Sequence, residues 1–113
     1  MRRAPYLLLA LLVGTIATPA AATSFGELLA WCGPPDRGGR PELCDNYLDA
    51  GLELLASPDK SLNEGVHVCV PKGEDRAKVV SLLRAYARSH PAAHSLDGVD
   101  GLGLVLKERY PCR

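Results

Sequence analysis

The chain has 113 residues, of which 47% are hydrophobic, and its 13 basic and 13 acidic side chains give a formal net charge of zero. A length near 100 residues is typical of one domain. Proteins that bind nucleic acid through its phosphates carry a strong basic excess, so this balance argues against a nucleic-acid partner.

The first 22 residues have the pattern of a signal peptide. Arg2 and Arg3 precede a short apolar run at 7–16, and small residues lead up to Ala22. The run is shorter than the roughly 20 residues that a membrane span needs, so we expect cleavage after Ala22 rather than an uncleaved anchor. Residues 23–113 would then form one periplasmic domain, with 11 of the 13 basic side chains against 13 acidic ones and no further membrane segment.

Two helices are predicted in the first half of that domain. Ser24 and Glu27 have the spacing of a capping box, which predicts a short helix ending near Cys32. A loop rich in proline and glycine follows. Pro41 suits the first turn of a second helix, whose apolar residues recur at helical spacing as far as Leu55.

The middle of the chain is less regular. Residues 57–65 are polar and predict a loop or one loose turn. Residues 66–70 alternate and are β-branched, but no second run of this kind offers a partner strand. We therefore expect an extended segment that ends at Pro71 and no sheet.

Two more helices are predicted in the second half. The helical pattern is strongest over 74–89, and it ends at His90 because the residue before Pro91 disfavours helical geometry. A fourth helix is expected from about Ser95 to Tyr110. Its three glycines either weaken it or let it approach a neighbour closely. The glycines are Gly98, Gly101 and Gly103.

The predicted fold class is all-α: a small disulfide-stapled bundle of about four helices, arranged as two αα-hairpins.

Four cysteines in a short exported chain predict two disulfides. Sequence alone permits three pairings, and the helix assignment ranks them. Cys32 and Cys44 flank one loop between helices, while Cys69 and Cys112 lie at the same open end of an antiparallel helix pair. We therefore favour Cys32–Cys44 and Cys69–Cys112, which would stabilise the fold by about 3 and about 4 kcal/mol in the chain-entropy model.

Residues with catalytic or metal-binding chemistry are few. His67 and Cys69 could form a nucleophile pair, but a disulfide at Cys69 removes its thiol. His90 and His94 have a metal-ligand spacing only on a continuous helix, and Pro91 interrupts that helix. We therefore predict no catalytic, cofactor or metal site, and no enzyme activity.

Exposed polar segments remain as candidates for partner binding. These are the polar loop before residue 66, the basic face of the third helix, and the turn that follows that helix. A solvated helix face explains the same basic pattern, so both interpretations stay open here. The candidate contacts are Asp59, Lys60, Asn63, Glu64, Lys78, Arg84, Arg88, His90 and His94.

An ordered set of motifs resembles the Rap/Tai family of type VI secretion amidase immunity proteins. The set comprises a cysteine-led helix start at 44–48, a Cys-x-Pro at 69–71, a helix-ending His-Pro at 90–91, and a terminal Tyr-Pro-Cys at 110–112. The resemblance covers nearly all of residues 23–113. The chain departs from it at Asn46, where the family often has glycine, and after the Cys-x-Pro.

The resemblance implies a periplasmic helical protein that binds a peptidoglycan amidase and blocks it sterically, often as a homodimer. Such amidases are typically papain-like cysteine peptidases. An alternative of another class is a small periplasmic stress or chaperone-like helical protein without enzymatic activity. Binding of one toxin separates the first hypothesis from broad suppression of aggregation, which the second predicts.

Overall fold

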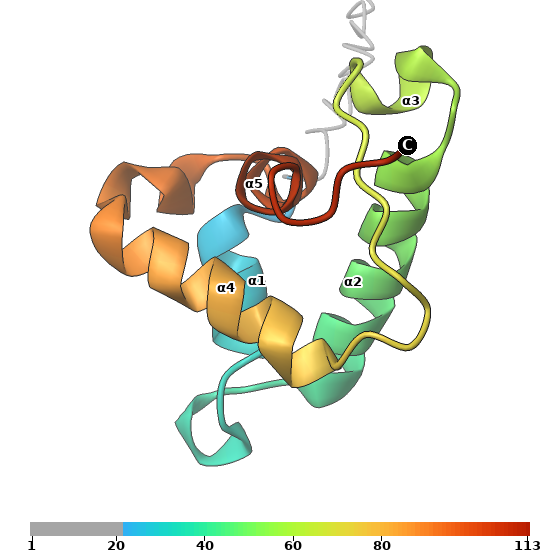
Figure 1. Ribbon diagram of the computed structural model, residues 1–113. Helices are drawn as coiled ribbons and strands as arrows, with labels where there is room; N and C mark the ends of the chain where they lie inside the picture. The colour runs from blue at the N-terminus through green and yellow to red at the C-terminus, as the bar shows by residue number, and fades with distance from the viewer. Residues whose placement is uncertain (1–21) are drawn as a thin grey trace, which may run out of the picture.

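A computed structural model describes residues 22–113, and the predicted signal peptide lies outside these residues apart from Ala22 (Figure 1). The four predicted helices are present, and a fifth, very short helix follows the second. Within the described residues there is no strand, only two isolated β-bridges. The elements are α1 (Phe25–Trp31), α2 (Pro41–Ala56), α3 (Lys60–Asn63), α4 (Arg76–Ser89) and α5 (Gly98–Leu106), with 3-10 turns η1 (Pro35–Arg37) and η2 (Pro91–Ser95).

The predicted capping box starts α1. The Ser24 hydroxyl accepts a hydrogen bond from the Glu27 amide at 3.1 Å, and the Glu27 carboxylate accepts one from the Ser24 amide at 3.5 Å. These bonds satisfy two amide groups that the helix itself leaves unpaired. Phe25 and Leu28 on this helix are completely buried, so α1 is anchored in the core from its first turn.

Helix α2 begins at Pro41, as the sequence predicts, and buries the side chains of Cys44, Leu48 and Leu55. The polar segment that follows forms the single turn α3. The Asp59 carboxylate caps this turn by accepting from the Ser61 amide at 2.9 Å.

Residues 66–70 form an extended strap that runs beside α2 (Figure 1). The Val68 amide donates to the Leu55 carbonyl at 3.0 Å, and the Cys69 amide donates to the Tyr110 carbonyl at 2.8 Å. An isolated bridge pairs Val68 with Pro111. The strap is thus held by isolated hydrogen bonds and joins no sheet, which confirms the prediction.

Helix α4 begins at Arg76, two residues later than predicted, because the Asp75 carboxylate caps the Ala77 amide at 3.0 Å. It ends at Ser89, and the His90–Pro91 pair follows, as predicted. Val79, Leu83 and Ala87 form its buried face.

Helix α5 is shorter than the predicted Ser95–Tyr110. The Asp97 carboxylate accepts from the Val99 amide at 3.1 Å and fixes the start at Gly98, while residues 91–95 form η2 instead. A Cβ atom on Gly98 would overlap Tyr47, and one on Gly101 would overlap the Phe25 ring. The glycines therefore permit close approach, the second of the two roles expected for them.

Helix α5 occupies the centre of the fold, where it contacts α1, α2 and α4 (Figure 1). Helix α1 contacts α2 within the first hairpin, and α4 contacts α5 within the second. The two hairpins pack against each other, with α5 at the centre. No helix of residues 22–113 combines the length and apolar character that a membrane crossing requires. The largest fully buried side chains are Phe25, Leu28, Leu48, Leu55, Leu83, Leu102, Leu106, Val68 and Val79.

Candidate partner-binding surface

Both disulfides have the predicted pairing. Cys32 bonds Cys44 across a separation of 12 residues, and Cys69 bonds Cys112 across 43 residues. The described residues contain no free cysteine. His67 lies beside the second disulfide, and its Nε2 is 3.0 Å from the Ala56 carbonyl oxygen. The Cys69 sulfur is bonded, so the His67–Cys69 pair is not a thiol nucleophile with its base.

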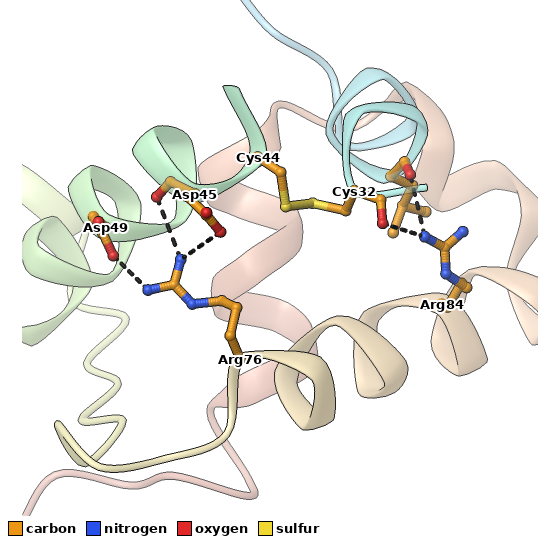
Figure 2. Close-up of a disulfide and its surroundings, with 7 residues drawn as sticks. Cys32, Cys44, Asp45, Asp49, Arg76 and Arg84 are labelled. Atoms are coloured by element: carbon orange, nitrogen blue, oxygen red, sulfur yellow. Dashed lines mark hydrogen bonds and ion pairs between the residues drawn. A yellow bond between two sulfur atoms is a disulfide. The ribbon is translucent and has the colours of Figure 1, made fainter. Parts of the chain in front are cut away.

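Two arginines of α4 fix the helices around the first disulfide (Figure 2). Arg76 donates to the Asp45 carbonyl at 3.3 Å and pairs with the Asp49 carboxylate, which joins α4 to α2. Arg84 donates to the carbonyl oxygens of Cys32, at 3.0 Å, and Leu29, at 3.5 Å. These carbonyls lie at the end of α1, where helical bonding leaves them unpaired. Arg84 therefore has a structural role and is half-buried rather than exposed, and its role as a partner contact stays a prediction.

Asn63 is a second polar residue whose predicted exposure is corrected. Its side chain is buried, and its amide nitrogen donates to the carbonyls of Ser57 at 2.8 Å and Leu54 at 3.2 Å. Its amide oxygen accepts from the Gly65 amide at 3.1 Å. The side chain closes the turn between α2 and the strap, and its burial removes it from the candidate contacts.

The other candidates near α3 are exposed. Hydrogen bonds from the hydroxyl and the amide of Ser61 hold the pKa of the Asp59 carboxyl below its usual range. Lys60 is the first residue of α3, and Glu64 follows the helix in a left-handed conformation with φ of 53°. These three side chains can reach a partner.

The candidates on α4 and η2 lie on another side of the molecule (Figure 1). Lys78 lies 3.9 Å from the Glu74 carboxylate, and the His90 ring stacks on Tyr86 with centroids 4.1 Å apart. Arg88 and His94 border a shallow depression of about 420 Å³ between α1 and α4. The structure therefore does not gather the predicted contacts into one surface.

A groove between α3 and α5 was not predicted. Leu54, Leu62 and Leu104 are the exposed large hydrophobic side chains of the described residues, at 37%, 52% and 39% exposure. All three line this groove of about 560 Å³, together with Val66 and Val99. We call it the α3–α5 groove. A sequence signal existed, since Leu62 and Leu104 fall outside the apolar stripes that predict the core.

Carboxylates dominate the rim of the α3–α5 groove. Glu64, Asp97 and Asp100 lie there against one cation, Lys107. The negative charges of this rim also act on Tyr47. Burial is the main cause that raises the pKa of the Tyr47 hydroxyl, and the charges of Asp97 and Asp100 raise it further. The rim is therefore acidic, and Glu64 is the one exposed candidate contact that belongs to it.

A polar contact fixes the C-terminal segment. The Tyr110 hydroxyl donates to the Glu74 carboxylate at 2.8 Å. This bond holds the pKa of the Glu74 carboxyl below its usual range, while burial and the same carboxylate raise the pKa of Tyr110. The contact joins the start of α4 to the chain end beside the second disulfide.

Comparison with known families gives the class of this scaffold. The model of the family described as Rap1a immunity proteins matches residues 24–112. The chain belongs to the Rap1a immunity protein family. Among curated proteins and among solved structures, no match was found. Rap1a membership implies immunity to a secreted toxin through binding of that toxin, and it confirms the family resemblance.

The motifs that pointed to the Rap1a family are structural in this chain. Cys69 and Cys112 form the second disulfide, Tyr110 bonds Glu74, and Pro91 follows the end of α4. These residues maintain the scaffold. Immunity proteins of this kind are typically not enzymes.

Proposed function

We propose that the chain is a periplasmic immunity protein that binds a peptidoglycan amidase delivered by type VI secretion and blocks its active-site groove sterically. The observation that carries the proposal is the Rap1a family match over residues 24–112. Two disulfides within residues 32–112 suit an oxidising compartment, and the N-terminal pattern predicts export to one. Peptidoglycan amidases act in that same compartment.

A rigid inhibitor favours steric inhibition, because ordering a flexible one would reduce its affinity. The disulfides, the Arg84 bonds to α1 and the Asn63 bonds at the turn before the strap all limit motion of the helices. A rigid helical scaffold of this kind presents loops and helix ends to the toxin without chemistry of its own.

The proposal predicts an amidase gene beside the gene of this chain, and cells that direct that amidase to their periplasm provide the test. We expect lysis without the chain, survival with the full chain, and lysis when the chain lacks residues 1–22 and stays in the cytoplasm. A matched control directs an unrelated phospholipase to the periplasm, against which the chain should give no protection. Lysis in the presence of correctly exported chain would contradict the proposal.

The homodimer implied by the family resemblance is part of the proposal. Light scattering on the purified chain, alone and with the amidase, measures how many copies each species holds. A monomer at every concentration would contradict this part without affecting inhibition.

A further inference from the structure

We propose that the α3–α5 groove receives a protruding apolar side chain of the amidase, and that a lysine or arginine beside that side chain pairs with the acidic rim. The inference rests on the proposed function and specifies the surface through which it operates. Three observations support it: the clustering of exposed leucines, the rigidity of the groove wall, and the charge of the rim.

The exposed leucines are unusual in their arrangement rather than their number. Single exposed leucines are common on protein surfaces, whereas clustered ones mark interaction sites. Leu54 comes from α2, Leu62 from α3 and Leu104 from α5, and all three border one hollow. Its volume of about 560 Å³ is sufficient for a large side chain of a partner.

The wall that carries Leu62 is held in place by partly buried hydrogen bonds. Asn63, the next residue, donates to the Ser57 and Leu54 carbonyls, and the Val66 amide donates to the Asn63 carbonyl at 2.9 Å. A short helix fixed in this way presents Leu62 without a large entropy loss on binding. The groove is thus formed before a partner arrives.

The rim charge selects the chemistry of the occupant. Glu64, Asp97 and Asp100 are exposed, and none belongs to an ion pair of the described residues. Lys107 offsets one of the three charges. A basic group on the partner would gain from this potential. A second copy of the chain, docked groove to groove, would instead bring two acidic rims together.

The depression at Arg88 and His94 is the weaker candidate. It is smaller, at about 420 Å³, and none of the exposed large hydrophobic side chains borders it. Arg84, which would supply part of its charge, is occupied by the carbonyls of α1.

The test compares L62K with A85K, which adds the same charge at an exposed position of α4 outside the groove. Binding of each purified variant to the amidase encoded beside the gene is measured by biolayer interferometry. We expect L62K to weaken affinity at least about tenfold, the size typical of a lost interface anchor, and A85K to change it less than about twofold. Thermal melts establish that both variants fold.

Charge reversal at the rim gives a second comparison that does not depend on Leu62. D100K should slow association with the amidase several-fold at low salt and much less at high salt, because rim charges steer encounter. D36K, on the exposed η1 turn, is its matched control and should leave the rate unchanged.

The outcomes separate this inference from the proposed function. Wild-type chain that fails to bind the amidase overturns the proposed function. Wild-type binding with equal affinities for L62K and A85K overturns the groove inference and leaves the proposed function intact. Loss of a homodimer in L62K with unchanged amidase affinity would assign the groove to self-association, which also overturns the inference. If L62K does not fold, the D100K and D36K comparison decides.

Discussion

Removal of the Cys69–Cys112 disulfide, by C69A/C112A, should destabilise the protein more than removal of the Cys32–Cys44 disulfide. The bond closes a loop of 43 residues, and the chain-entropy model assigns such a loop about 4 kcal/mol. The C32A/C44A variant opens a loop of 12 residues and should lose about 3 kcal/mol. Domains of this size have total stabilities of about 5–14 kcal/mol, so either loss is a large share.

Urea unfolding followed by far-UV circular dichroism measures these losses. With a slope of about 1–2 kcal/mol per molar urea, the midpoint for C69A/C112A should fall by about 2–4 M. Its midpoint should also lie below that of C32A/C44A, because the longer loop gains more freedom on unfolding. A smaller loss for C69A/C112A than for C32A/C44A would refute the loop-length reasoning. It would indicate that the Tyr110–Glu74 contact holds the chain end by itself.

Three further predictions concern single side chains. Because the hydrogen bond from Tyr110 lowers the pKa of Glu74, wild-type stability should fall as pH drops below about 4.5 through that lowered pKa. Urea midpoints for E74Q should show less of this acid loss, and parallel pH profiles would contradict it. G101A should lower the free energy of unfolding by about 1–3 kcal/mol because its Cβ atom would overlap Phe25, whereas G73A should change it by less than about 0.5 kcal/mol. Equal melting temperatures for the two variants would contradict this prediction. R84M should lower the free energy of unfolding by about 1–3 kcal/mol because the carbonyls at the end of α1 lose their hydrogen-bond donor. An unchanged melting temperature would refute the structural role of Arg84.

Local signals predicted most of the scaffold. The capping box at Ser24 and Glu27, the proline start of α2 and the His90–Pro91 stop all act within a few residues, so their outcome is visible in sequence. The disulfide pairing followed because helix ends that share one end of a hairpin bring their cysteines together.

The predicted helix boundaries were wrong where two local signals compete. Ser95 and Asp97 can both start a helix. The helix starts after Asp97, because its carboxylate accepts hydrogen bonds from two backbone amides. The turn α3 has four residues, which is too short for periodicity to detect.

The surface was less predictable because its residues meet only through tertiary packing. Asn63 and Arg84 are polar and were expected on the surface, yet they bond backbone carbonyls, which lie six residues away for Asn63 and 52 residues away for Arg84. The α3–α5 groove depends on Leu62 and Leu104, which come from separate elements and lie outside any stripe. Sequence marks each leucine as unusual but does not place the two side by side.

Titration of peptidoglycan hydrolysis with the purified chain tests the central claim most directly. The amidase encoded beside the gene is held at fixed concentration, residues 23–113 are added stepwise, and the release of cleaved peptides is measured. We predict a linear fall in rate to zero near equal molar amounts, as a tight complex requires, while lysozyme on the same substrate is unaffected. An unchanged amidase rate at a large molar excess of folded, disulfide-bonded chain would contradict the account.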